Sequence, residues 1–244
     1  MIDIRRAGER FHTDLGWLDS WHSFSFGGHH DPENVHHGLL LVSNDDRVAA
    51  GGGFPTHAHR DMEIVTWVLE GRLEHRDSEG NHGILYPGLA QRMSAGSGIR
   101  HSEMNASDTE PVRFVQMWVV PDRRGADPGY EQIDVNDRLA AGGLVAVASG
   151  EGHDGAVALR QADAVLWVGR LRPDEVIEVP AAPHGHVFVA RGTAELDGSA
   201  ELGGGPEPDG SALLEGDAVR LTGEAALGLQ AGPEGAEVLI WATA

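Results

Sequence analysis

Short strand-like runs, separated by turn residues, place the strongest limit on how this 244-residue chain can fold. Runs at 63–69, 113–120 and 165–171 are rich in β-branched and aromatic side chains, and Gly, Pro, Asp and Asn lie between such runs. This spacing is typical of an all-β sandwich or barrel. Helical periodicity is scarce, and one short helical turn is expected within 134–141. We therefore predict an all-β protein.

A weak internal repeat indicates that one β-module occurs twice. Residues 68–74 (VLEGRLE) resemble residues 189–195 (VARGTAE), and each copy is followed by a loop, a turn and another strand-like run. Pro and Gly residues between 121 and 143 interrupt the strand pattern. We therefore expect two stacked β-barrel or jelly-roll domains, residues 1–130 and 131–244. The segment 203–210 (GGGPEPDG) is expected to be a loop tip of the second domain.

Composition excludes several classes of protein. The chain has no cysteine, which rules out a disulfide scaffold and a metal site built on thiolates. It has no lysine, which rules out Schiff-base chemistry. A formal net charge of −20 argues against direct binding to the phosphates of a nucleic acid. No apolar run approaches the ~20 residues of a membrane span, and no apolar segment of a signal peptide follows the N-terminal arginines. We expect a cytoplasmic protein that does not enter a membrane.

Two short motifs carry the residues suited to chemistry. His57 and His59 are two positions apart, and so are His101 and Glu103. In a β-strand, side chains at i and i+2 point to one face. If both strands line one barrel interior, three imidazoles and one carboxylate converge. This donor set suits Fe, Mn, Co, Ni, Cu or Zn, and it leaves positions on a six-coordinate ion for water, O₂ or a chelating substrate.

The segments around these motifs resemble the pirin family of cupin proteins. The resemblance covers about residues 1–135, and it is closest to the bacterial branch associated with quercetin 2,3-dioxygenase activity. It rests on four stretches of sequence: 16–32 (GWLDSWHSFSFGGHHDP), 57–88 (HAHRDMEIVTWVLEGRLEHRDSEGNHGILYPG), 93–105 (MSAGSGIRHSEMN) and 114–121 (FVQMWVVP).

The resemblance implies a bicupin fold and a ligand set made of the HxH and HSE motifs. These ligands fall on His57, His59, His101 and Glu103, the same residues that the strand argument selects. Glu63 is an alternative carboxylate ligand, because it lies four residues after His59, where many cupins supply theirs. We prefer Glu103, which shares a strand face with His101, and expect Glu63 to stand behind the ligands.

Other residues have competing interpretations. His75 is expected at the surface, whereas Gln116 and Trp118 either line a pocket or pack in the core. The second module has an HxH pair, His184 and His186, but no His-x-Glu follows it. We therefore expect one metal per chain, held by the first module.

The resemblance implies a function that the residues alone do not specify. We expect a metal-dependent dioxygenase that uses O₂ on a flavonol-like aromatic enol, with one divalent transition metal, iron foremost. Glu103 would also accept the proton of the enol. The alternative is a metal-bearing regulatory protein of the pirin type, which has a protein partner and no turnover. An apolar cavity beside the metal, large enough for a bicyclic ligand, would favour the enzyme.

Overall fold

The chain folds almost entirely into β-strands. The computed structural model describes residues 1–196, 212–223 and 227–244. Within them lie twenty strands, a 3₁₀ turn (Ala7–Glu9) and one short α-helix, α1 (Asn136–Ala140), inside the predicted range 134–141. The prediction of an all-β protein is confirmed. The expected loop tip at 203–210 lies outside the described residues.

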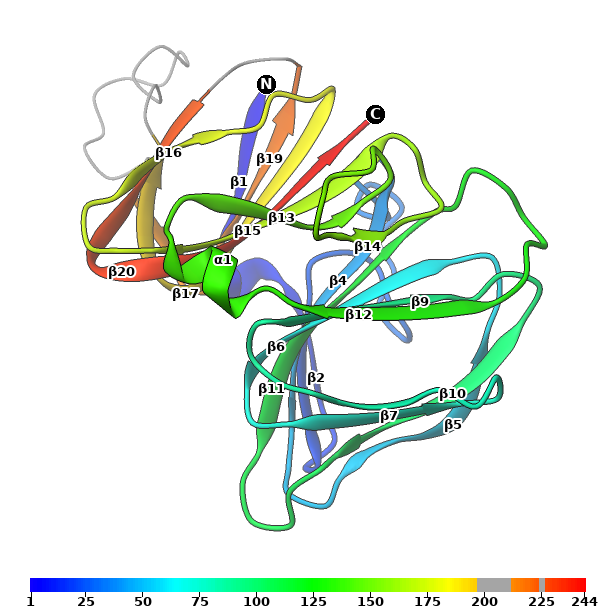
Figure 1. The fold of residues 1–244 in the computed structure, drawn as a ribbon. Coiled ribbons are helices and arrows are strands. Elements are labelled where there is room, and N and C mark those ends of the chain that lie inside the picture. The colour runs from blue at the N-terminus through cyan, green and yellow to red at the C-terminus, as the bar shows by residue number, and fades with distance from the viewer. Residues whose placement is uncertain (197–211, 224–226) are drawn as a thin grey trace.

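The described strands form three sheets (Figure 1). A seven-stranded sheet has the order β12 (Gly129–Asp134), β9 (Leu89–Ser94), β6 (Glu63–Glu70), β11 (Val112–Val119), β4 (Leu40–Val48), β3 (Leu18–His22) and β2 (Phe11–Asp14). A four-stranded sheet has the order β5 (Gly53–His59), β10 (Ile99–Asn105), β7 (Leu73–Asp77) and β8 (His82–Leu85). Together these two sheets make the first module, in the lower right of Figure 1.

The third sheet makes the second module. Its order is β1 (Ile2–Arg5), β19 (Ala218–Thr222), β17 (His184–Leu196), β20 (Leu227–Thr243), β15 (Ala164–Leu171), β13 (Leu144–Ser149) and β14 (Val157–Ala158). Two further strands join it, β16 (Val176–Val179) on β20 and β18 (Ala212–Leu214) on β17. In all three sheets the described strands run from edge to edge without closing. The modules are therefore jelly-roll-like layers rather than closed barrels. Two β-barrel or jelly-roll domains were predicted, and the jelly roll is confirmed.

The seven-stranded sheet is the central layer of the molecule. Every residue of β6 except Glu70 is buried, because one face of the sheet packs on the second module and the other faces the four-stranded sheet. Trp67 and Met117 lie in one core cluster with Phe188 and Trp241 of the second module. The indole nitrogen of Trp67 also donates a 2.8 Å hydrogen bond to Glu237. The two modules therefore share one continuous core.

Two strands cross the proposed division at residue 130. The N-terminal strand β1 pairs with β19 in the sheet of the second module, and Figure 1 shows both chain termini on that side. Strand β12 pairs with β9 in the first module. The domains 1–130 and 131–244 remain our proposal as a division by chain order. Within the part of the chain that the structure describes, none of the helices has the length and apolar character that a membrane crossing requires.

Candidate metal centre

Antiparallel pairing of β5 with β10 brings the two sequence motifs together. His57 lies directly opposite His101, and His59 lies opposite Ile99. The register shifts between His101 and Glu103, which places Glu103 opposite Phe54. Both motifs are therefore on adjacent strands of the four-stranded sheet, as the spacing of two residues requires for donors on one face.

Three of the predicted donors form one compact group. Ligand atoms of His57, His59 and His101 all lie within 4.8 Å of one another. The ring centroids of His57 and His101 are 4.4 Å apart, and those of His59 and His101 are 4.9 Å apart. Glu103 belongs to a second group, with His101 and His75, whose ligand atoms meet the same limit. His101 therefore links Glu103 to the other two predicted donors.

The unpaired nitrogens of this group fit a metal ion. Nε2 of His59 and Nε2 of His101 are buried and have no hydrogen-bond partner, although buried polar atoms are nearly always paired. Nδ1 of His57 donates to the carbonyl of Pro55 at 2.9 Å, which leaves its Nε2 as the free lone pair. Three imidazoles beside a carboxylate are the donors that divalent transition metals take in proteins.

Electrostatics keep two of these imidazoles neutral and ready to bind. Burial, with a smaller effect of neighbouring His57, lowers the pKa of His59 to about 4. Burial lowers the pKa of His101 to about 2, with added repulsion from the nearby histidines. Because metal competes with protons for the ring nitrogen, this depression removes the competition near neutral pH.

The prediction that His75 lies at the surface is wrong. Its side chain is fully buried, because β7 is an inner strand of the four-stranded sheet and His75 lies opposite Glu103. Nδ1 of His75 lies 3.5 Å from Nδ1 of His101, and its Nε2 lies 3.2 Å from Asp77. Asp77 thus fixes the tautomer of His75, and His75 in turn orients His101, as residues behind a metal ligand commonly do.

Glu103 is held by a side chain from the facing sheet. The amide nitrogen of Gln116 donates to both of its carboxylate oxygens, at 2.9 and 2.8 Å, and Trp118 donates to the amide oxygen of Gln116 at 3.1 Å. Burial raises the pKa of Glu103 to about 7. Gln116 and Trp118 both line the cavity described below. Of the two interpretations of Gln116 and Trp118, lining a pocket is therefore confirmed over packing in the core.

The alternative carboxylate, Glu63, lies on the other face of the central sheet. Its Oε2 accepts hydrogen bonds from Ser94 at 2.8 Å and from the backbone of Arg160 in the second module at 3.2 Å. It belongs to neither donor group. The register of β6 explains this position. Thr66 lies opposite Gln116 and faces Glu103. Glu63 is three residues before Thr66, and because side chains alternate along a strand, it points to the opposite face.

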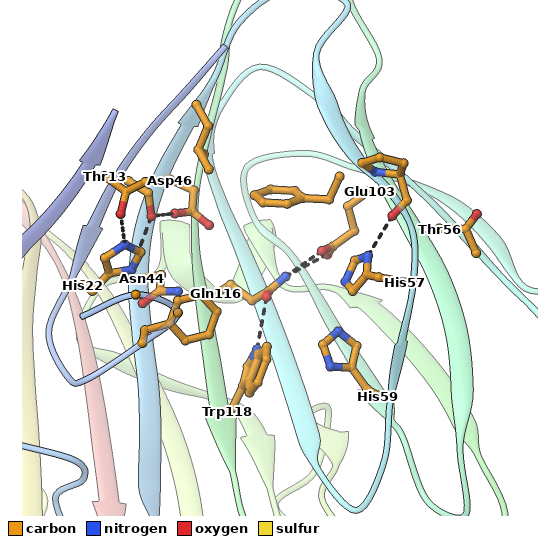
Figure 2. Close-up of a pocket in the computed structure, with 17 residues that line it drawn as sticks. Thr13, His22, Asn44, Asp46, Thr56, His57, His59, Glu103, Gln116 and Trp118 are labelled. Carbon is orange, nitrogen blue, oxygen red and sulfur yellow. Dashed lines mark hydrogen bonds between the residues drawn. The ribbon is translucent and has the colours of Figure 1, made fainter. Parts of the chain in front are cut away.

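A cavity of about 500 Å³ adjoins these donors. Figure 2 shows His57, His59 and Glu103 on one side of it and a second set of polar side chains on the opposite side, with Gln116 and Trp118 between. Its apolar lining comes from Leu18, Phe26, Phe54, Pro55 and Trp118. The opposite polar set consists of Thr13, Ser20, His22, Asn44 and Asp46.

The polar side chains opposite the histidines come from two neighbouring strands. In the pairing of β3 with β4, Ser20 lies opposite Asp46 and His22 lies opposite Asn44. Ser20 donates a short hydrogen bond to Asp46, and burial raises the pKa of Asp46 to about 7. Sequence analysis missed this set. Its signal was available, because Ser20-x-His22 and Asn44-x-Asp46 each repeat at the period of a strand.

Comparison with known proteins agrees with this description. Residues 4–119 match the family model described as pirin, and residues 146–241 match the model of the quercetinase C-terminal cupin domain. A Mycobacterium tuberculosis protein provisionally named quercetin 2,3-dioxygenase is 54% identical over 241 residues, which cover 98% of this chain and 94% of that protein. Quercetin 2,3-dioxygenase of Escherichia coli K12 is 44% identical over 200 residues, which cover 81% and 85% of the two chains.

Solved structures extend the likeness to the whole fold. The crystal structure of YhhW from Escherichia coli has a TM-score of 0.88 and 37% identity, and the match covers 100% of this chain and 98% of YhhW. A second structure, of the bacterial pirin YhhW in complex with nickel(II), has a TM-score of 0.86 and 37% identity over 99% and 98% of the two chains.

Two stacked jelly-roll modules, of which the first carries a cluster of histidines and a carboxylate beside a cavity, define a bicupin with donors for a divalent metal. The chain belongs to the pirin family.

Proposed function

We propose that the protein is a metal-dependent dioxygenase of the quercetin 2,3-dioxygenase type, which acts with O₂ on a flavonol-like aromatic enol. One observation carries the proposal: a cavity of about 500 Å³ opens directly onto His57, His59 and Glu103. This volume lies within the range of sites that enclose small organic molecules. A purely regulatory metal site has no need of such a cavity.

The proposed ligands of a single divalent metal are His57, His59, His101 and Glu103. We place iron first, and Mn, Co, Ni, Cu and Zn suit the same donors. When bound, such an ion supplies a Lewis-acidic centre that favours the ionised form of an enol and, if redox-active, supplies electrons for chemistry with O₂. The nickel complex of YhhW supports binding of a divalent metal by this fold.

Glu103 is the proposed acceptor of the enol proton. With no metal bound, burial raises the pKa of Glu103 to about 7, so the carboxylate can take up a proton near neutral pH when it is released from a bound cation. Gln116 holds the carboxylate in one orientation by bonding both oxygens. Glu103 is 2% exposed, so a proton that it accepts is shielded from bulk water.

The two ends of the cavity fit the two ends of a flavonol. The fused ring with its enol and carbonyl would lie at the histidine end, between the walls formed by Phe54 and Trp118. The distal ring would then reach the opposite polar set, where Asp46 and His22 can bond phenolic hydroxyls. Hydrogen bonds at both ends would orient the ring for reaction.

The decisive experiment is oxygen uptake with two matched compounds. A flavonol has a hydroxyl next to its carbonyl, whereas the corresponding flavone lacks it and cannot chelate. Protein reconstituted separately with Fe, Mn, Co, Ni, Cu and Zn is expected to consume O₂ with the flavonol and not with the flavone. The matched control is His101→Ala, which should be inactive with both. Equal, negligible uptake with both compounds for every metal would reject the enzyme and favour the regulatory alternative.

A further inference from the structure

Arg220 is a buried arginine with no carboxylate partner. Its side chain lies on β19 and the residue is 6% exposed. Within the described residues no carboxylate oxygen lies within 4.0 Å of its guanidinium. Asp3, across the β1–β19 pairing, is held instead by Arg5 at 2.8 Å. Buried charges in proteins are normally paired, because an unpaired one carries the full cost of leaving water.

Other buried arginines of this chain follow that rule. Arg92 pairs with Glu131 at 2.9 Å, and Arg113 pairs with Asp45 at 2.9 Å. Arg220 uses one nitrogen, Nη2, for neutral acceptors, the carbonyl of Ser23 at 2.9 Å and the amide oxygen of Asn34 at 2.6 Å. Its Nε is buried without a partner. The guanidinium also lies over the ring of Phe24, 4.4 Å from its centroid, and Asp3 is its opposite residue on β1, but no described carboxylate lies within 4.0 Å of it.

A small pocket lies against this arginine, at the boundary between the two modules. Its volume is about 30 Å³, which holds about one water-sized species. Four of the residues that line it have a buried side-chain atom without a hydrogen-bond partner: Nη1 of Arg10, Oγ of Ser23, Nε2 of His186 and Nε of Arg220. Arg10 and Ser23 belong to the N-terminal part of the chain, whereas His186 and Arg220 lie on β17 and β19.

Among the arginines that line the pocket, Arg220 alone has no carboxylate of the described residues within 4.0 Å. Arg10 lies 3.8 Å from Asp45, but the carboxylate of Asp45 already accepts both hydrogen bonds of Arg113. One carboxylate at the pocket, Glu9, is engaged at 3.0 Å by the backbone nitrogen of Arg6. Arg5 and Arg6 also line the pocket, but Arg5 pairs with Asp3 and Arg6 pairs with Asp217, each at 2.8 Å.

We propose that this pocket binds one small monovalent anion of the halide class, held by Arg10, Ser23, His186 and Arg220. Both arginine atoms can only donate hydrogen bonds, and the hydroxyl and a neutral imidazole can donate as well. A spherical anion has no preferred direction, so it can accept from several of these donors together. A water molecule can satisfy hydrogen bonds but leaves Arg220 without a counter-charge, and the small volume favours a small anion.

Such an anion would tie the N-terminal segment to the second module. Arg10 and Ser23 reach it from one side, and His186 and Arg220 reach it from the other. Because a ligand that binds only the folded state raises its stability by mass action, the stability of the chain should depend on the anion itself and not only on ionic strength.

The test measures thermal unfolding of the full chain at constant ionic strength, while sodium chloride or bromide replaces sodium methanesulfonate, whose anion is larger than a halide. We expect the melting temperature to rise saturably by about 2–4 °C with either halide, the shift that ~1 kcal/mol produces in a chain of this size. Arg220→Gln should abolish the rise, whereas Arg123→Gln, an exposed control, should keep it.

Two further measurements keep the proposal falsifiable if Arg220→Gln does not fold. Ser23→Ala removes a single donor, so it should shift the halide concentration of half-maximal effect upward. Crystals of the unaltered protein grown in bromide should show an anomalous peak between Arg10 and Arg220. Equal melting temperatures in halide and methanesulfonate, a rise that survives in Arg220→Gln, or a pocket without an anomalous peak would each overturn the proposal.

Discussion

The amide nitrogen of Gln116 lies 2.9 Å from Oε1 and 2.8 Å from Oε2 of Glu103. This contact joins the two sheets of the first module, because Gln116 comes from β11 and Glu103 from β10. Trp118 donates to the amide oxygen of Gln116, which leaves the amide nitrogen pointing at the carboxylate. Glu103 is therefore presented to the histidines by a residue whose hydrogen bonds go to Glu103 and Trp118.

The first prediction concerns this contact. Gln116→Met keeps the length of the side chain and removes both hydrogen bonds to Glu103, so metal affinity should fall about 10–100-fold, as when a residue behind a metal ligand is changed. Competition titration with a chelator measures the affinity. Gln132→Met, on the edge strand β12, is the matched control and should leave the affinity unchanged. Equal affinities for the Gln116 variant and unaltered protein would show that Gln116 does not position Glu103.

The second prediction is one metal per chain. Metal analysis of protein purified without chelators should give one equivalent, and His101→Ala should lose it, because His101 belongs to both donor groups. His82→Ala is the control, since His82 is an exposed histidine of the same four-stranded sheet that contacts Glu74. Two equivalents in the unaltered protein, with one retained in His101→Ala, would point to a second site.

The third prediction separates the two candidate carboxylates. Glu103→Gln should lower metal affinity by at least about tenfold, since it removes a negatively charged donor. Glu63→Gln should leave metal affinity within a few-fold and act on stability instead, because Glu63 bonds Ser94 and the backbone of Arg160. The readouts are metal content and the melting temperature of each variant. A larger loss of metal in the Glu63 variant would reverse the assignment.

The fourth prediction is a pH dependence of stability that arises from Asp46. Burial raises its pKa to about 7 in the folded chain, above the ordinary value of 3.8. The folded state then binds the proton more tightly than the unfolded state, so the contribution of Asp46 to stability is full at low pH and is lost as pH rises through 7. Asp46→Asn cannot ionise, and its side-chain oxygen can still accept from Ser20.

The melting temperature of Asp46→Asn minus that of unaltered protein at the same pH should therefore increase between pH 5 and pH 8. Each ~1 kcal/mol of relative stabilisation corresponds to about 2–4 °C. Ser20→Ala removes the hydrogen bond that favours the ionised form of Asp46, so its melting temperature relative to unaltered protein should fall, not rise, between the same pH values. A difference in melting temperature that is the same at both pH values would mean that Asp46 is ionised throughout.

Much of the fold and of the candidate site could be predicted because it follows from local alternation. His57 with His59, and His101 with Glu103, share a strand face in any regular β-strand, and three of these four form one donor group. The strand runs at 63–69 and 113–120 correspond to β6 and β11 within one residue at each end. The repeat of residues 68–74 at 189–195 predicted two modules, in agreement with two family models along the chain.

Alternation does not say which face of a strand is turned inward, because that depends on how the strand pairs. Glu63 and Glu103 were both plausible ligands from spacing, and the register of β6 against β11 turned Glu63 toward the second module. His75 looked like a surface residue until pairing of β7 with β10 buried it against His101. For each of these side chains, burial depends on a partner strand that is distant in sequence.

The sequence by itself determined that this chain forms short strands and that four metal-type donors lie at strand spacing, since both are properties of neighbouring residues. Only the tertiary structure decided that Ser20, His22 and Asp46 face the histidines across a cavity. It also decided that β1 pairs with β19, and that Arg220 is buried beside Ser23 rather than exposed. These contacts join segments as much as 219 residues apart, from Ile2 to Leu221, and they form only when the sheets pack on one another.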